Sequence, residues 1–208
     1  PSWQNALLEL RRRVQDLGIL IVLNGVVGNS TSRKLDPEEF RGFALADTQA
    51  PLVFINGSDS KSAQMFTLAH ELAHLWLGAT AISNASAAPV AGFRREEVWC
   101  NAVAAELLVP LVTLQADLVA DEALDDAVAR LTRRYKVSSL VILRRLLDAG
   151  WLTRAAFEAA WAAERARLRV IAERSGGGGD FYRTTLSRVS RRFARALVES
   201  TLEGQTLY

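Results

Sequence analysis

One helical segment, at about residues 62–77, constrains this chain more than any other part of its sequence. Apolar side chains occur on nearly every side of the helix, so the sequence predicts that it is buried. The polar residues Thr67, His70, Glu71 and His74 recur at steps of three and four, which places them on one stripe. Burying imidazoles and a carboxylate costs on the order of several kcal/mol unless they are paired or coordinated. The stripe therefore predicts a polar cleft lined by this helix.

The spacing of His70, Glu71 and His74 is typical of a metal-dependent hydrolase. Histidines at i and i+4 of a helix point the same way and can bind one tetrahedral ion. The glutamate between them can accept a proton from the water that the ion activates. Such a site needs three protein ligands, so that a fourth position stays open. The chain has 2 histidines in all, so the third ligand is another type of residue. We expect zinc as the ion.

The candidates for the third ligand lie on the next predicted helix, at about residues 94–109. Glu97 and Asn101 stand one helical turn apart, so Glu97 can bind the metal while Asn101 hydrogen-bonds a ligand imidazole and supports it. Glu96 is the nearest alternative, and the partner one turn away favours Glu97. Cys100 is a further candidate, although a small buried helical residue is the simpler explanation of that position.

Composition narrows the class of protein. The chain has 208 residues, of which 50% are hydrophobic, enough for a sizeable core in one large domain or in one domain with a helical appendix. A net charge of +2 is too small to indicate nucleic-acid binding from bulk electrostatics. The single cysteine excludes an internal disulfide framework and fits a reducing compartment. The sequence has no signal-peptide pattern and no long apolar run, so we expect a cytoplasmic protein without membrane contact.

Short predicted strands precede the motif helix, and predicted helices follow it. The expected elements before it are a helix through about Leu17, a strand over 19–23, a helix start at 36–39, and strands over 42–45 and 52–55. Everything after Ser60 is predicted to be helix and connecting loop. The expected fold class is therefore α+β, with a small mixed or antiparallel sheet packed on the motif helices and a mostly helical C-terminal region.

Four regions are predicted along the chain. A catalytic core spans 1–120, and a helical region spans 121–174. A Gly-rich linker over 175–180 then leads to a basic helix over 181–208, which could mediate oligomerisation.

Two segments together resemble a known family. FTLAHELAHLWLG at Phe66–Gly78 and EVWCNAVAAELLVP at Glu97–Pro110 are similar to the ImmA/IrrE family of bacterial metallopeptidases, and the strand at Pro51–Asn56 also suits it. The resemblance is strongest over residues 42–110 and covers most of 1–150 more loosely.

The resemblance implies a fold, a cofactor and a substrate. It implies a small sheet on zincin-type motif helices, with His70, His74 and Glu97 as zinc ligands and Glu71 as the general base. Members of the family cleave helix-turn-helix repressors of the XRE type in stress, phage or mobile-element responses. Many relatives carry a DNA-binding domain in front of the peptidase domain. A start at proline rather than methionine would fit a chain from which such a domain has been cut away.

The residues that would bind the substrate are less constrained. If the strand before the motif helix is an edge strand, it could hold an extended substrate by strand addition. The residues of that strand are Leu52, Val53, Phe54 and Ile55. A donor for the oxyanion, often worth about a hundredfold or more in rate, would be Tyr135, Tyr182, an arginine, a backbone amide or the metal itself.

Two alternatives come from other classes of protein. The first is a non-catalytic module that keeps zinc for regulation or for a toxin–antitoxin-type interaction. Structural zinc sites normally have four ligands, and three good ones are found, which favours catalysis. The second is a DNA contact through the helical region, because residues 137–146 resemble the recognition helix of a helix-turn-helix. The simpler explanation is an amphipathic helix that packs on the catalytic domain, with solvated arginines.

Overall fold

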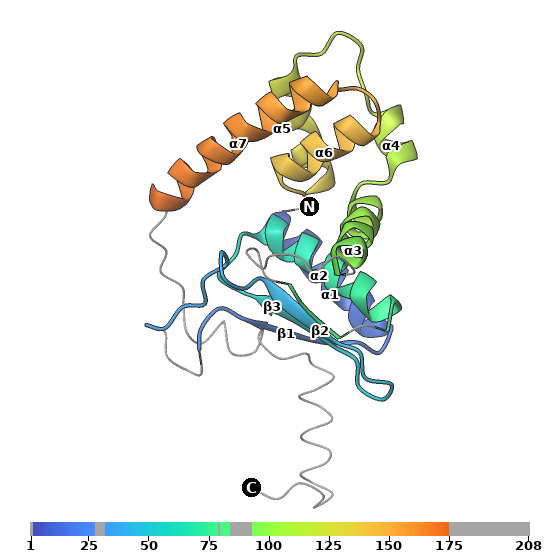
Figure 1. The fold of residues 1–208 in the computed structure, drawn as a ribbon, viewed down its shortest axis with the longest axis vertical. Helices are drawn as coiled ribbons and strands as arrows, with labels where there is room; N and C mark the ends of the chain where they lie inside the picture. Colours follow the sequence, from blue (N-terminus) through green and yellow to red (C-terminus); the bar gives the residue numbers. More distant parts are fainter. Residues whose placement is uncertain (1, 28–31, 79, 84–92, 175–208) are drawn as a thin grey trace, which may run out of the picture. The chain divides into compact units, whose positions relative to one another are not determined.

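A computed structural model describes residues 2–27, 32–78, 80–83 and 93–174 of the chain (Figure 1). The chain forms two compact units, and the boundary between them falls between Cys100 and Asn101. The described part of the first unit combines a sheet with helices, and that of the second is helical. The expected α+β class is therefore confirmed.

The first unit is built on a four-stranded mixed sheet in the order β1-β3-β2-β4. The strands are β1 (Leu20–Asn24), β2 (Gly42–Leu45), β3 (Leu52–Asn56) and β4 (Ala81–Ser83). β1 pairs with β3 in parallel, whereas β2 pairs antiparallel with both β3 and β4. The central strand is thus β3, whose alternate residues Val53 and Ile55 are fully buried.

Substrate binding by strand addition required an edge strand, and the strand of Leu52, Val53, Phe54 and Ile55 does not meet this condition. β3 is hydrogen-bonded on one side to β1 and on the other to β2, so it has no free backbone edge to which a substrate strand could add. The sequence could not show this, because the parallel pairing with β1 joins segments that lie about thirty residues apart. In the described part of the chain the edges belong to β1 and β4.

Two further local predictions are corrected. β4 is a strand after Ser60, where only helix and loop were expected, and its three residues are too few to show a periodic pattern. The expected helix start at residues 36–39 is a single turn. Asp36 accepts hydrogen bonds there from Glu38 N, at 2.8 Å, and Phe40 N, at 3.0 Å. The chain then extends into β2 rather than continuing as a helix.

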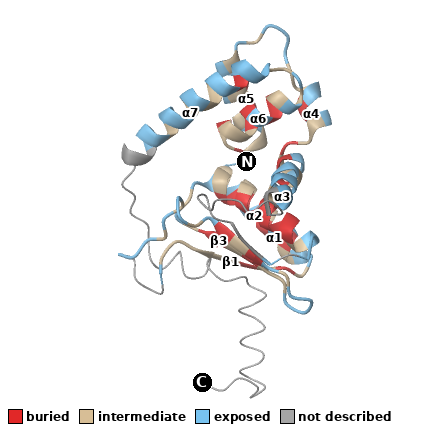
Figure 2. Cartoon of the chain, in the orientation of Figure 1, coloured by how far each residue is buried: buried red, intermediate tan, exposed pale blue. Residues whose placement is uncertain are grey.

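Two helices pack on one face of the sheet, and both begin at a serine cap. They are α1 (Trp3–Asp16) and α2 (Lys61–Trp76). Ser2 accepts from Asn5 N at 3.1 Å, and Ser60 accepts from Ala63 N at 3.2 Å, which satisfies a free amide at each helix start. The core that joins them to the sheet is Val14, Ile19, Ile21, Val53, Ile55, Leu68 and Leu72. Burial of each large side chain contributes roughly 1.5–3 kcal/mol, which holds α2 against β3 (Figure 2).

The remaining helices are α3 (Phe93–Leu108), α4 (Leu111–Ala116), α5 (Leu124–Tyr135), α6 (Ser139–Asp148) and α7 (Arg154–Arg174). The second unit has its own core, formed by Val109, Leu114, Leu131, Val137, Ile142 and Leu146. Val109 and Leu114 precede the boundary predicted at residue 120, yet they pack among these helices. Apolar contact therefore groups residues 101–120 with the helical region.

Two of the segments predicted from the sequence cannot be compared with the structure. The linker at 175–180 and the basic helix at 181–208 lie outside the described residues. Among the described helices, none is long and apolar enough to cross a membrane.

Candidate metal centre

The two histidines of α2 have their side chains close together. They stand four residues apart, so both side chains leave α2 on the same face, and their Nε2 atoms lie 3.1 Å from each other. His70 is 6% exposed and His74 is 0% exposed, which shields both rings from solvent. Leu68 and Leu72, on another face of α2, anchor the helix in the core and so fix the direction of this pair.

Glu97 of α3 completes the group. Its Oε2 lies 3.2 Å from His70 Nε2, and its Oε1 lies 3.1 Å from His74 Nε2. His70, His74 and Glu97 form a cluster in which each can offer one ligand atom to the same metal ion. The structure thus brings together the three residues that the sequence analysis singled out as metal ligands.

The donor set and its spacing fit a divalent metal ion. A tetrahedral zinc site with bonds of about 2.0–2.1 Å has ligand atoms roughly 3.3 Å apart. The two Nε2 atoms are 3.1 Å apart, and each has a different Glu97 oxygen at 3.1–3.2 Å. Burial and the neighbouring His70 lower the pKa of His74, so its imidazole is neutral. The hydrogen bond with His70 lowers the pKa of Glu97 despite partial burial, so its carboxylate is ionised. Neutral imidazole and ionised carboxylate are the protonation states that metal binding requires.

Glu71 lies next to these ligands in the sequence and is fully buried, at 0% exposure. Its carboxylate is close to β2: a Cβ atom added at Gly42 would lie 3.3 Å from Glu71 Oε1. Gly42 was missed by the sequence analysis. The available signal was the pair of small residues, Gly42 and Ala44, at alternate positions of a predicted strand. Small residues on one face of a strand allow close approach of a helix.

The other candidates for the third ligand do not enter the cluster. Glu96 is exposed on α3, whereas Glu97 is half-buried. Cys100 is fully buried, and burial together with the nearby carboxylates of Glu97 and Glu71 raises the pKa of its thiol to about 12. A thiol with so high a pKa is protonated at neutral pH, which fits a buried packing residue.

The supporting role expected of Asn101 stays a prediction. Asn101 is exposed on α3, one turn after Glu97. The Nδ1 atoms of His70 and His74 are buried and have no hydrogen-bond partner among the described residues. A metal-binding imidazole usually donates a hydrogen bond through its second nitrogen. These two rings lack such an acceptor among the described residues.

Neither tyrosine suggested as an oxyanion donor is described as part of the sheet unit. Tyr135 belongs to the helical unit, where its hydroxyl donates to Asp117 Oδ2 at 2.6 Å. Tyr182 lies outside the described residues.

A sequence model described as the IrrE N-terminal-like domain, of a metallopeptidase type, matches residues 14–147. The match spans more than half of the chain and includes the whole cluster. The chain belongs to this family. A second model, of a domain of unknown function, matches residues 189–208, which lie outside the described structure. A search of curated proteins found no match.

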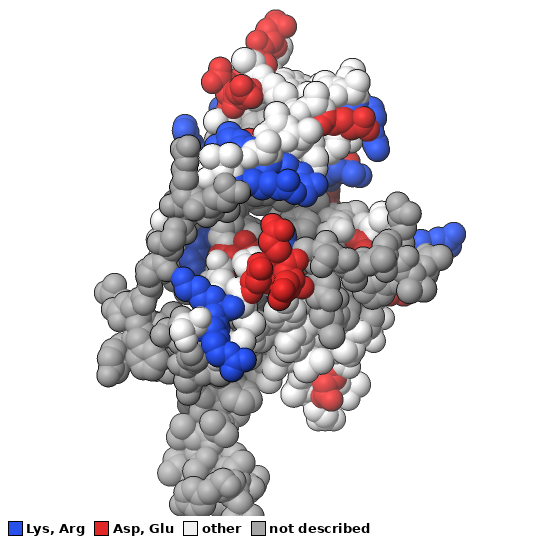
Figure 3. All heavy atoms as spheres, turned by 60° about the vertical axis from the view of Figure 1, so that its left-hand side comes forward, with Lys and Arg blue, Asp and Glu red and all other residues white. Residues whose placement is uncertain are grey.

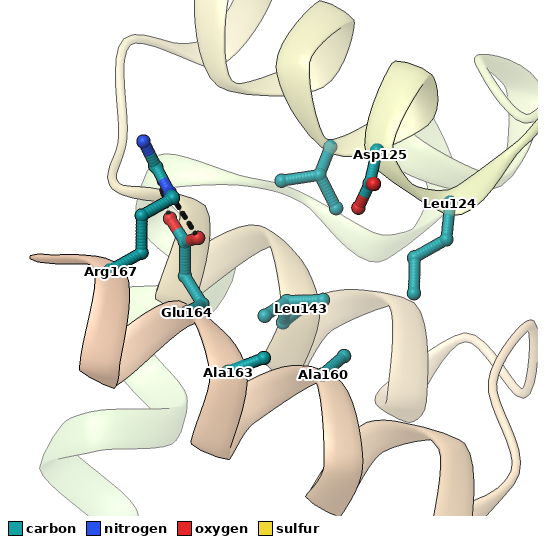
Figure 4. Close-up of a pocket in the computed structure, with 8 residues that line it drawn as sticks. Leu124, Asp125, Leu143, Ala160, Ala163, Glu164 and Arg167 are labelled. Atoms are coloured by element: carbon teal, nitrogen blue, oxygen red, sulfur yellow. Dashed lines mark hydrogen bonds and ion pairs between the residues drawn. The ribbon is translucent and has the colours of Figure 1, made fainter.

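The IrrE N-terminal-like region extends through most of α6, the helix that resembles a recognition helix. In the described structure, one face of α6 is covered by α7. Ser139 Oγ hydrogen-bonds to Glu164 of α7, and Leu143 is only 3% exposed. Leu143 lines a cavity of about 250 Å³ together with Ala160 and Ala163 of α7 (Figure 4). A groove-reading helix needs such a face free for base edges.

The arginines of α6 are engaged within the helical unit. Arg145 is 5% exposed and donates to Val109 O at 3.0 Å, to Asp148 and to Glu106. Arg144 is exposed and pairs with Asp148 at 3.1 Å. The expectation of solvated arginines therefore holds for Arg144 and is wrong for Arg145. Basic and acidic side chains both occur on the molecular face that Figure 3 shows.

Proposed function

We propose that this chain is a zinc-dependent endopeptidase that cleaves a helix-turn-helix repressor of the XRE type. The observation that supports the chemistry is the convergence of His70, His74 and Glu97 beside a fully buried Glu71. Membership of the IrrE N-terminal-like family supports a metallopeptidase. The resemblance to the ImmA/IrrE family, whose members cleave such repressors, supports the choice of a repressor.

Each residue of the site has a separate task in this proposal. His70, His74 and Glu97 hold zinc, which when bound acts as a Lewis acid and lowers the pKa of a water molecule to about 7. Glu71 accepts a proton from the attacking water and returns it to the leaving nitrogen of the peptide bond. Glu71 is fully buried, which limits the access of bulk water to its carboxylate.

The substrate is expected to offer a flexible segment rather than a folded surface. A peptide bond can approach buried catalytic groups only when the chain around it is locally unfolded. A linker between the DNA-binding part and the remainder of a repressor has this property. Cleavage there separates DNA binding from dimerisation and releases the controlled genes, as in a stress, phage or mobile-element response.

The decisive variant is Glu71→Gln, which keeps the shape of the side chain and removes the base. We expect zinc content equal to that of the wild type and a loss of hydrolysis of at least about a hundredfold. Zinc is measured by elemental analysis after dialysis, and hydrolysis by mass spectrometry of the products. Full activity of Glu71→Gln would refute the assignment of the base.

The substrate is tested with an XRE-type repressor encoded beside the gene for this chain. We expect one or a few specific fragments when the wild-type protein and Zn²⁺ are both present, and intact repressor with Glu71→Gln. Denatured casein is the control for general peptidase activity. If casein is cleaved and the repressor stays intact, the peptidase activity is supported and this substrate is excluded.

The alternative of a non-catalytic zinc module for regulation, DNA binding or a toxin–antitoxin-type interaction predicts other outcomes. Wild type and Glu71→Gln would then bind zinc equally and both leave repressor and casein intact. A DNA titration at two salt concentrations tests the remaining nucleic-acid function. Because α7 covers the Ser139 and Leu143 face of α6, we expect no sequence-specific DNA binding through that helix.

A further inference from the structure

Gly42, the first residue of β2, lies in closer contact with the motif helix than any side chain would allow. A Cβ atom at this position would lie 2.6 Å from Thr67 Cγ2 and 2.7 Å from the carbonyl oxygen of Phe54. Real Cβ atoms essentially never come within 3.0 Å of such neighbours. The same Cβ would lie 3.3 Å from Glu71 Oε1, which is tighter than nine in ten real contacts.

Two further features indicate that β2 as a whole packs closely against α2. Ala44, the next residue of β2 on the same face, is also small and is 0% exposed. Thr67 and Glu71 stand one turn apart on α2, so both belong to the surface of the helix that meets β2. Both are buried, at 6% and 0% exposure. The backbone of β2 thus forms one wall of the space that holds the Glu71 carboxylate.

We propose that Gly42 is a positioning residue for the reaction, because its missing side chain leaves room for the Thr67 methyl group and for the Glu71 carboxylate beside it. A movement of β2 away from α2 is opposed by its pairing in the sheet. Its backbone pairs with β3, in which Ile55 is fully buried. An added methyl group would also meet the carbonyl oxygen of Phe54 at 2.7 Å, so it must shift the pairing of β2 with β3 as well as Thr67. The Glu71 carboxylate, which lies 3.3 Å from the same point, must then shift too. This inference rests on the proposed role of Glu71 as general base.

The test is Gly42→Ala. We expect kcat to fall about tenfold with KM and zinc content unchanged, because the carboxylate must shift by a few tenths of an ångström. A displacement of 1 Å at a catalytic group can cost about a hundredfold, so a smaller loss fits a smaller shift. The double variant Gly42→Ala with Thr67→Ser removes the nearest clashing methyl, and we expect it to recover part of the lost kcat.

The control is Gly25→Ala, which crowds backbone elsewhere in the same unit. A Cβ there would lie 2.8 Å from Ser58 N and 2.7 Å from Ser58 Oγ, and no atom of α2 is among its nearest neighbours. We expect Gly25→Ala to lower the urea midpoint of unfolding and to leave kcat unchanged. Equal losses of kcat in Gly25→Ala and Gly42→Ala would overturn the positioning role, as would a loss that follows zinc content.

Two further measurements keep the inference testable if an expected variant or activity fails. If Gly42→Ala does not fold, Thr67→Ser alone loosens the same contact, and an unchanged kcat would overturn the proposal. If the wild-type protein hydrolyses nothing, the proposed function has failed. The contact between Gly42 and Glu71 is then tested by urea unfolding. We then expect Gly42→Ala to lower the urea midpoint less in a Glu71→Ala background than in the wild type. Equal shifts in both backgrounds would show that Gly42 does not make room for Glu71.

Discussion

The buried arginine of the helical unit and the buried histidines of the sheet unit are satisfied in opposite ways. In the helical unit the buried Arg145 has its guanidinium distributed over Val109 O, Asp148 and Glu106, so its charge is satisfied by protein groups. In the sheet unit the buried His70 and His74 direct their Nε2 atoms at each other and at Glu97. Their Nδ1 atoms have no hydrogen-bond partner among the described residues.

The difference separates a structural polar cluster from one that could hold a metal ion. Folding alone favours polar groups that satisfy one another, because an unsatisfied buried group costs roughly 1–3 kcal/mol. Arg145 meets that requirement and therefore serves the packing of α6. The Nε2 atoms of the two histidines and the Glu97 carboxylate converge on one another, an arrangement that a bound cation stabilises. Buried polarity alone is thus a weaker indicator of function than the direction in which the donors and acceptors point.

The sharpest test of the metal cluster compares two adjacent carboxylates. We expect Glu97→Gln to lower zinc affinity by more than the ~100-fold that the loss of a supporting residue causes, because a direct ligand loses its charge. Glu96→Gln, on the exposed side of the same helix, should leave zinc affinity unchanged. Competition with a chromophoric chelator measures both. Equal affinities of the two variants would show that Glu97 is not a ligand.

Truncation of a side chain in each core should show whether zinc binding depends on the sheet unit alone. Leu68 and Ile142 are each fully buried, and replacing either by alanine should cost about 2–5 kcal/mol of unfolding free energy. Leu68→Ala should also weaken zinc binding, because Leu68 anchors α2 against the sheet. Ile142→Ala belongs to the core of the helical unit and should leave zinc binding intact. Urea unfolding followed by circular dichroism, with and without zinc, measures both effects.

The smallest effect concerns the arginines of α6. Arg145→Met should destabilise the helical unit by about 2 kcal/mol, because hydrogen bonds to charged groups are worth roughly 1.5–3 kcal/mol. Arg144→Met removes only an exposed ion pair with Asp148 and should cost less than about 1 kcal/mol. Neither variant should change zinc content. If Arg145→Met were as stable as Arg144→Met, the contrast between the two units would lose its energetic basis.

The sequence by itself determined the local features of this protein. The stripe of His70, Glu71 and His74 follows from helical periodicity, and Ser2 and Ser60 start their helices through contacts within three residues. The α+β class and the family also follow from local patterns and motifs. Such features are predictable because the interacting groups lie within about one helical turn of each other along the chain.

Only the tertiary structure decided the features that join distant segments. It brought Glu97 rather than Glu96 or Cys100 to the histidines, although all three lie on the same helix. It placed β3 in the centre of the sheet, and it covered one face of α6 with α7. It also revealed the contact of Gly42 with Thr67 and Glu71. Strand order and helix packing depend on nonlocal pairing and burial, which a periodic pattern within one segment does not specify.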